Sequence, residues 1–116
     1  MRLLICGDRH WKDYDYIYKI LQEYSPMTTV VITGGATGAD SIANQIATEL
    51  KMTTEVYPAD WKRYGKSAGP IRNAEMIKKG CPDVVLAFHN NLQLSKGTAN
   101  MITKAREVNI PVYIFP

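Results

Sequence analysis

The chain contains one glycine-rich stretch, which directly follows an apolar run at Val30–Ile32: Gly34-Gly35-Ala36-Thr37-Gly38-Ala39-Asp40. Glycines let a turn tighten and let a ligand approach the backbone closely. The first N–H groups of a following helix attract anions. The spacing is neither that of a P-loop nor the G-x-G-x-x-G of a dinucleotide fold, because Gly34 and Gly35 are adjacent. We predict a phosphate site here; a tight turn with Asp40 as a first-turn acid is the alternative.

A second stretch with the same kind of chemistry precedes the last predicted helix and reads Ser95-Lys96-Gly97-Thr98. Its hydroxyl and N–H groups are donors, and Lys96 adds a point charge that a phosphate would accept. A simple helix N-cap by Ser95 is the structural alternative. We therefore expect two phosphate-binding turns, each at the start of a helix.

Two arginines belong to the loops that follow predicted strands. Arg9 and Arg72 can each clamp a phosphate or a carboxylate with two parallel hydrogen bonds. Ion pairing with Asp8, Asp60 or Glu75 is the structural alternative, and both roles can hold at once. We expect these arginines to add positive charge to a ligand site.

Five further side chains in these loops have a chemical and a structural interpretation. Trp11 and Trp61 can stack on a base, but a loop tryptophan more commonly anchors its loop to the core, and for Trp61 we favour the anchor. Asp40 and Asp60 are candidates to bind ribose hydroxyls. His89 is a candidate acid or base, or else a polar lining residue.

The elements that must position these residues form an alternating series of strands and helices. Apolar residues at three- and four-residue spacing mark the helices, and right-handed crossovers favour a parallel sheet. We predict an α/β fold: a single Rossmann-like, doubly wound, mostly parallel five-stranded sheet flanked by helices, over residues 1–116. The predicted strands are Leu3 to Cys6, Thr29 to Thr33, Thr53 to Tyr57, Asp83 to Phe88 and Pro111 to Phe115; the helices are Asp13 to Tyr24, Ala39 to Lys51, Ala68 to Lys79 and Lys96 to Val108.

Ligands on such a sheet bind outside the carboxyl ends of the strands. The loops at that edge hold nearly all the arginine, tryptophan, histidine and glycine of the chain, whereas the loops at the other edge carry little chemistry. If the loops only connected elements, these residue types would not be concentrated at one edge. We therefore expect a ligand site at the carboxyl edge, which also includes Gly7, Gly69, Pro70 and Asn73.

Composition excludes several other classes of protein. A chain of 116 residues fits one domain that buries a core without disulfides. Two cysteines without a C-x-x-C motif and two histidines indicate neither a metal site nor a metal cofactor. No apolar run could span a membrane, and we expect a cytoplasmic protein. The net charge of +3 is spread along the sequence, so nucleic acid is an unlikely partner.

Three motifs together resemble those of a known family. Gly34 to Asp40, Pro58 to Met76 and Gly97-Thr98 look like the YspA/cpYpsA-related branch of the SLOG superfamily, over almost the whole chain. The resemblance implies a Rossmann-like domain that binds a nucleotide or a nucleotide-derived ligand, such as an ADP-ribose or NAD-derived signal. It also implies a sensor or sequestering protein, found in bacteria and their phages.

The resemblance extends to phosphoribohydrolases of the Lonely Guy type, which cleave a nucleoside monophosphate with an arginine and a glutamate. Arg72 can correspond to the arginine, but Met101 stands where the glutamate would fall. A glycosidic bond that breaks through an oxocarbenium-like state needs a carboxylate nearby, and Asp8, Asp40 or Asp60 could supply it. An N-glycosidase of this kind, with Arg72, Asp40 and Asp60 as candidate catalytic residues, is the alternative function.

Self-association is a further expectation. Relatives of this kind assemble, and the chain carries four tyrosines that look exposed in the sequence. We therefore expect a homo-oligomer that uses Tyr14, Tyr16, Tyr18 and Tyr24.

Overall fold

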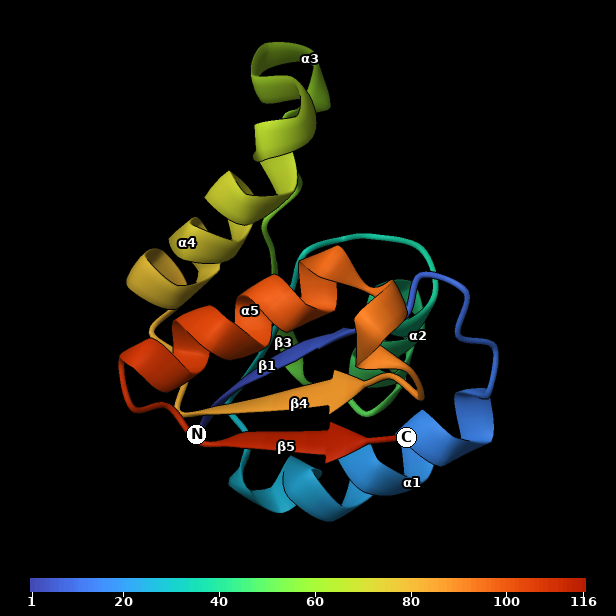
Figure 1. Ribbon diagram of the computed structural model, residues 1–116. Coiled ribbons are helices and arrows are strands. Elements are labelled where there is room, and N and C mark those ends of the chain that lie inside the picture. Colours follow the sequence, from blue (N-terminus) through green and yellow to red (C-terminus); the bar gives the residue numbers. More distant parts are fainter.

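The computed structural model describes residues 1–116 as one α/β layer structure around a five-stranded sheet (Figure 1). The strands are β1 Arg2–Gly7, β2 Val30–Thr33, β3 Thr53–Val56, β4 Val84–Phe88 and β5 Val112–Phe115. Their order is β3-β2-β1-β4-β5, and every neighbouring pair is parallel. The sheet is therefore doubly wound about β1, as the alternating sequence pattern predicts.

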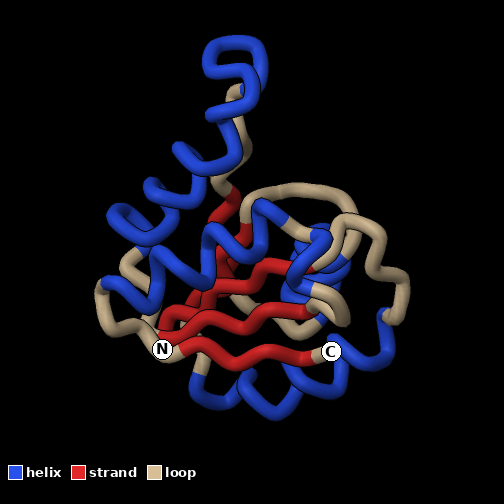
Figure 2. The backbone as a smooth tube through the Cα atoms, in the orientation of Figure 1, coloured by secondary structure: helices blue, strands red, loops and turns tan.

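Helices cover both faces of the sheet (Figure 2). One face packs against α1 Tyr14–Tyr24 and α2 Ala39–Glu49, and the other against α4 Ala68–Gly80 and α5 Lys96–Glu107. Side chains of a strand alternate between these two cores, so Leu3 and Ile5 pack towards α1 and α2, while Leu4 and Cys6 pack towards α4 and α5. No helix is both long and apolar enough to span a bilayer.

Three short 3₁₀ turns and one short helix complete the chain. The turns are η1 Ser25–Met27, η2 Gly65–Ser67 and η3 Leu92–Leu94. The four-residue helix α3, Trp61–Tyr64, lies in a segment that sequence periodicity did not identify as helical. With η2 it forms a projection that rises away from the sheet beyond the start of α4 (Figures 1 and 2). We call residues 61–67 the arm.

One predicted helix end differs from the observed one. The third predicted helix ends at Lys79, but α4 includes Gly80, and Cys81 takes the left-handed conformation with φ 46°. A side chain at Gly80 would place its Cβ 3.2 Å from Cδ1 of Ile32. Gly80 therefore serves the close approach of α4 to β2 rather than the turn itself.

The four tyrosines that suggested self-association do not form an exposed surface. Tyr14, Tyr16, Tyr18 and Tyr24 are each half-buried and pack against the core beneath α1 and α2. Tyr16, for example, meets the ring of Phe88 edge-on at 6.2 Å. The expectation of exposed tyrosines was wrong, because the α1 stripe that faces the core is wider than its aliphatic residues alone indicate.

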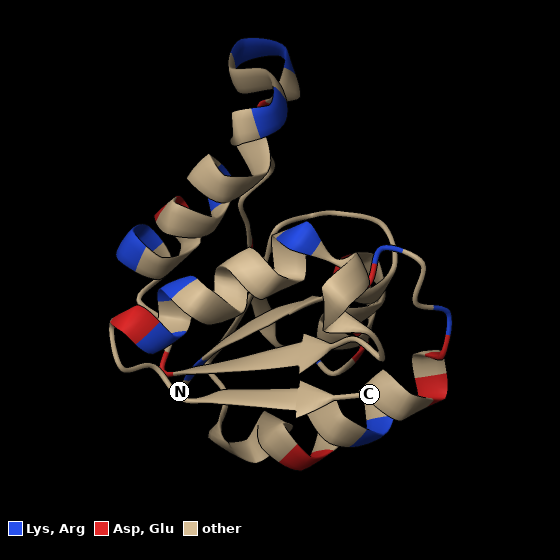
Figure 3. Ribbon diagram, viewed as in Figure 1, with Lys and Arg blue, Asp and Glu red and all other residues tan.

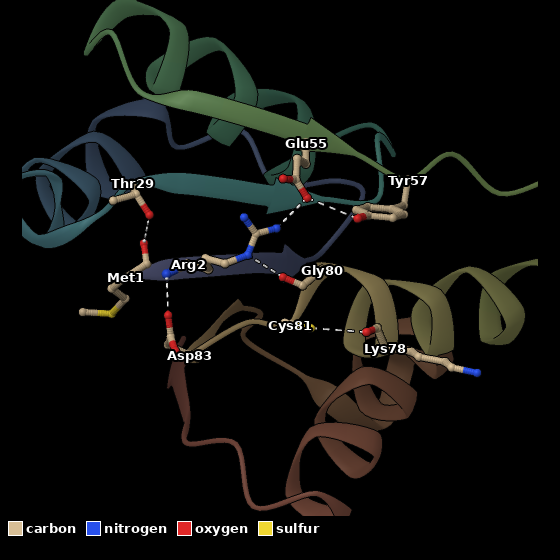
Figure 4. A network of polar contacts seen from close by, with 9 residues as sticks. All are labelled: Met1, Arg2, Thr29, Glu55, Tyr57, Lys78, Gly80, Cys81 and Asp83. Carbon is tan, nitrogen blue, oxygen red and sulfur yellow. Dashed lines mark hydrogen bonds and ion pairs between the residues drawn. The ribbon is translucent and has the colours of Figure 1, made fainter.

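The amino edge of the sheet is closed by a polar network around Arg2 (Figure 4). Its guanidinium donates to Oε1 of Glu55 at 2.7 Å and to the carbonyl of Gly80 at 2.6 Å. Its backbone N–H donates to Oδ2 of Asp83 at 2.6 Å, and the hydroxyl of Tyr57 donates to the same Glu55 oxygen at 3.1 Å. Arg2 therefore joins β1, β3 and the end of α4 through Nε and Nη2.

Candidate functional site

A cleft of about 500 Å³ opens at the carboxyl edge of the sheet. It lies where β1 and β4 end and where α4 and α5 begin, as expected for a doubly wound sheet. The structure brings most of the predicted site residues together in its lining: Gly7, Asp8, Arg9, Ala36, Asp40, Trp61, Arg72, Asn73, His89, Ser95, Lys96, Gly97 and Thr98.

The guanidinium of Arg72 is held in place by uncharged groups. Its Nη1 donates to the carbonyl of Gly34 at 2.8 Å, and its Nε donates to Oδ1 of Asn73 at 2.9 Å. A Cβ on Gly34 would lie 2.7 Å from the Cζ of Arg72, so the guanidinium packs where only glycine leaves room. The Nη2 group has no partner within the chain, and no carboxylate lies within ion-pairing distance, although the charge of Asp40 is close enough to interact with it.

Asn73 links this arginine to the start of α5. The asparagine is 3% exposed, and its Nδ2 donates to the carbonyl of Gly97 at 3.2 Å and to Oδ1 of Asn100 at 3.1 Å. Its own Oδ1 accepts from Arg72. All the hydrogen-bonding groups of this buried amide have partners, so α4 and α5 hold their first turns in fixed relation.

Asp40 holds the glycine-rich loop in its conformation through two hydrogen bonds. Its Oδ2 accepts from the N–H groups of Gly34 at 3.1 Å and of Ala36 at 3.2 Å. Those two donors are therefore used by the chain itself, and the N–H of Ala39 donates to the carbonyl of Asp8 at 3.0 Å. A phosphate site on the Gly34–Ala39 backbone stays a prediction, and two of its donors are already used by a carboxylate of the same chain.

The carboxyl group of Asp40 sits in an unusual electrostatic environment. Burial raises its pKa from 3.8 to about 6, against the opposing effects of the hydrogen bond from Ala36, the charge of Arg72 and the hydrogen bond from Gly34. It lines the cleft, and both recorded hydrogen bonds go to Oδ2. Oδ1 is therefore the atom available to accept from a ligand hydroxyl.

The N-terminus of α5 also offers backbone donors to the cleft. Ser95 is the N-cap, and its Oγ accepts from the N–H of Thr98 at 3.2 Å, while Ala99 donates to the Ser95 carbonyl. Gly97 faces open space, since a Cβ there would meet nothing within 4 Å. The predicted cap is thus present, and the first turn beside Lys96 lies in the cleft.

His89 and Asp8 line the cleft, and each side chain already accepts one hydrogen bond from the chain itself. Nδ1 of His89 accepts from the N–H of Asn91 at 2.9 Å, which leaves Nε2 as the protonated nitrogen, and the side chain is buried. Oδ1 of Asp8 accepts from the N–H of His10 at 2.8 Å and shapes the loop after β1. Both residues are therefore lining groups with one free polar atom each.

The two tryptophans have different surroundings in the structure. Trp11 anchors its loop: its ring meets Tyr16 at 5.6 Å and Phe88 at 5.8 Å, and its Nε1 donates to the carbonyl of Asp13 at 3.0 Å. Trp61 lines the cleft and is 61% exposed, so the favoured anchoring role was wrong for this residue. Trp61 is the ring that remains free to stack.

The remaining predicted residues lie outside the lining. Asp60 is exposed, caps α3 by accepting from the N–H of Arg63 at 3.2 Å, and does not reach the cleft. The others shape the surrounding backbone or the base of the arm: Gly34, Gly35, Gly38, Ala39, Gly69 and Pro70.

Four lining residues were not predicted: Cys6, His10, Met76 and Leu94. Leu94 is 81% exposed at the mouth of the cleft. Burial raises the pKa of the Cys6 thiol, and the negative charge of Asp40 acts in the same direction. The position of Cys6 at the end of β1, one residue before Gly7, was the signal that could have identified it. Met101 is fully buried in the core beneath α5.

Three cations that form no ion pair line the cleft. The two ion pairs of the chain join Arg2 to Glu55 and Lys79 to Glu75, and both lie away from the cleft. Arg9, Arg72 and Lys96 line the cleft with no carboxylate within ion-pairing distance. Unneutralised cations beside an open helix N-terminus are suited to an anion.

The fold and the cleft define a Rossmann-like α/β protein with a polar, cation-lined cleft at the carboxyl edge of its sheet. The chain belongs to the YspA, cpYpsA-related SLOG family, whose profile matches residues 1–64. It is 41% identical over 122 residues to the Gene 61 protein of Mycobacterium phage D29, a match that covers 98% of this chain and 95% of the relative. No solved structure matches it. Membership of this family suggests a nucleotide-related protein.

Proposed function

We propose that the cleft binds a nucleotide or a nucleotide-derived ligand, such as an ADP-ribose or NAD-derived signal, and that the protein senses or sequesters it. The observation that carries this proposal is the position of Arg72, whose guanidinium is fixed by two uncharged acceptors and forms no ion pair. A buried or half-buried cation without a partner is costly unless a ligand supplies the opposite charge. A phosphate supplies it with matching geometry.

The phosphate belongs at the start of α5 rather than on the glycine-rich loop. Gly97 leaves space there, Lys96 supplies a point charge, and Nη2 of Arg72 lies in the same cleft. The helix dipole favours an anion at this position. The carboxylate of Asp40 would repel a phosphate placed on Gly34 and Ala36.

The other parts of a nucleotide have matching groups in the same lining. Trp61 and Leu94 are exposed apolar side chains at the mouth of the cleft, and a base can stack on the indole. Oδ1 of Asp40 can accept from a ribose hydroxyl. The cleft therefore provides one group of the required type for phosphate, sugar and base.

Native mass spectrometry tests this assignment. The purified protein is incubated with AMP, NAD, ADP-ribose and the cyclic isomers of ADP-ribose, and the bound material is then extracted and identified. We expect an intact adduct with at least one of these compounds. Absence of any adduct across the panel would contradict the proposal.

A second candidate function is hydrolysis of a nucleoside monophosphate at its glycosidic bond. The specific observation in its favour is Asp40, a carboxyl group with a pKa of about 6 that lines the same cleft as Arg72. Such a group can stabilise an oxocarbenium-like state when ionised. Asp60 does not reach the cleft, and Met101 is in the core, so Asp40 or Asp8 would have to supply the carboxylate.

Free base distinguishes the two functions. Adenine and ribose 5-phosphate that accumulate from AMP with wild-type protein, and that Asp40→Asn abolishes, would establish the enzyme. The binding function predicts that AMP is recovered intact from both proteins. Met76→Leu, which changes a lining side chain without changing charge, is the matched control for Asp40→Asn.

A further inference from the structure

The arm has the composition of a surface that meets a polyanion. Residues 61–67 read Trp-Lys-Arg-Tyr-Gly-Lys-Ser, and all seven are exposed. No acidic residue occurs between Asp60 and Glu75. Lys62, Arg63 and Lys66 form no ion pair within the chain. The arm therefore concentrates three unneutralised charges on one small projection (Figure 3).

Two aromatic rings lie among these charges. Trp61 is 61% exposed and Tyr64 is 40% exposed, and the guanidinium of Arg63 stands 5.1 Å from the centre of the Tyr64 ring. Helix α3 packs chiefly against η2 and α4, so the sheet does not cover these rings. Cations with interleaved, exposed aromatic rings are the combination that holds single-stranded nucleic acid, through phosphate contacts and base stacking.

The arm is continuous with the cleft. Trp61, its first residue, lines the cleft together with Arg72 and Lys96. Positive charge therefore extends from the tip of the arm to the proposed phosphate position at the start of α5. A nucleotide in the cleft that continued through a phosphodiester would pass onto the arm.

The geometry points to a single-stranded oligonucleotide as the ligand, with its terminal nucleotide in the cleft and the following phosphates and bases on the arm. This inference rests on the proposed function of the cleft. A second copy of this chain is the other occupant that an exposed arm could meet. Lysine is depleted at protein interfaces, whereas two of the three arm cations are lysines, so charge favours the nucleic acid.

The linear sequence hides this feature, because a net charge of +3 over 116 residues looks evenly spread. Lys62, Arg63 and Lys66 nevertheless lie within five residues of one another, and α3 and η2 carry them on a projection that begins at the N-cap Asp60. The sequence-based expectation that nucleic acid is an unlikely partner is therefore the one that this inference replaces.

Fluorescence anisotropy with a labelled oligothymidylate of fifteen nucleotides tests the inference. Lys62→Gln/Lys66→Gln/Arg63→Gln removes the arm charges, and Lys78→Gln/Lys104→Gln/Arg106→Gln removes the same number from the far ends of α4 and α5. We expect the arm variant to bind the oligonucleotide at least about tenfold more weakly than the control variant. Each phosphate contact contributes roughly 0.7 to the slope of log affinity against log salt concentration. Loss of the three arm charges should therefore lower the magnitude of that slope by about 2.

Three further measurements separate the possible outcomes. Tyr64→Ala should weaken oligothymidylate binding, since Tyr64 is on the arm but not in the cleft lining, and should leave AMP and ADP-ribose affinities unchanged. Intact binding of AMP or ADP-ribose with no oligonucleotide binding would overturn this inference and leave the proposed function standing. An arm variant that changes the mass in solution, while its oligonucleotide affinity equals that of the control, would assign the arm to a second copy and also overturn it.

Discussion

Asp40 holds a loop and lines a cleft with the same carboxyl group. Its Oδ2 accepts from two backbone N–H groups, and its side chain is 6% exposed. Desolvation outweighs the hydrogen bonds and the charge of Arg72, which is why the pKa rises to about 6. The folded protein therefore binds this proton more tightly than the unfolded chain does.

The pH dependence of stability follows from that difference. Because the folded pKa lies above the unfolded one, Asp40 stabilises the fold below about pH 4, and this contribution is lost as the pH rises through 6. The shift from 3.8 to about 6 corresponds to about 3 kcal/mol. In urea unfolding between pH 4 and 7, we expect Asp40→Asn to become progressively more stable relative to wild type. Parallel pH profiles for the two proteins would contradict this account.

Gly34 controls the position of Arg72. A Cβ at this glycine would meet the end of the arginine side chain, which can move, and would not meet backbone. We expect Gly34→Ala to change the free energy of unfolding by less than about 1 kcal/mol. The displaced guanidinium should nevertheless weaken AMP or ADP-ribose binding about tenfold, since hydrogen bonds to charged groups are strong. Calorimetric titration measures the affinity, and an unchanged affinity would show that Arg72 needs no such positioning.

The residue types of the site could be predicted from the sequence, but their roles depended on distances that the sequence does not contain. Arg72 and Lys96 follow strands and carry charge, so they were expected at the carboxyl edge. Nothing in the local sequence indicates that Asp40 reaches back to Gly34 and Ala36, or that Phe88 provides the surface on which Trp11 packs. The Asp40 contacts depend on the exact conformation of the loop, and the contact of Trp11 with Phe88 joins residues that only the completed fold brings together.

At the scale of elements, the turn between β2 and α2 is fixed by a backbone that only glycine adopts easily. Gly38 has φ +78°, and a Cβ there would overlap the backbone of Asp8 and Arg9. We expect Gly38→Ala to lower the free energy of unfolding by about 2 kcal/mol or more. Gly34→Ala, at a glycine without positive φ, is the internal control in the same urea experiment. Equal stability of the two variants would mean that the turn relaxes without cost.

Periodicity predicted the long helices and missed the short one. The four main helices present apolar residues at helical spacing over eleven residues or more, and their predicted bounds lie within two residues of the observed ones. Helix α3 has four residues, which is too few for a repeat to show. Its N-cap Asp60 was instead interpreted as a ribose ligand, because a capping aspartate and a binding aspartate look the same in a loop.

For the whole molecule, the charged side chains at the two edges of the sheet differ in what they contact. At the amino edge Arg2 pairs with Glu55 in a network that joins strands and helix α4 (Figure 4). The carboxyl edge keeps Arg9, Arg72 and Lys96 unpaired around a cleft. Cations left unpaired around a cleft are expected when a ligand supplies their partners.

Self-association remains a proposal at this scale. The half-buried tyrosines of α1 no longer motivate it, whereas edge strand β5 exposes Tyr113 at 52% and Ile114 at 38%. The mass in solution, measured with the charge-neutral variant Tyr113→Ser beside wild type, tests whether this edge joins two copies. A monomeric wild-type mass at all concentrations would contradict it.

The central claim is that Arg72 meets a phosphate in the cleft. Isothermal titration with the tightest-binding compound from the nucleotide panel tests it in three proteins: wild type, Arg72→Gln, and Arg106→Gln as a control at the far end of α5. We predict binding about 10- to 100-fold weaker for Arg72→Gln, from the loss of a charged hydrogen bond, and unchanged binding for Arg106→Gln. Equal affinities for Arg72→Gln and wild type would contradict the claim.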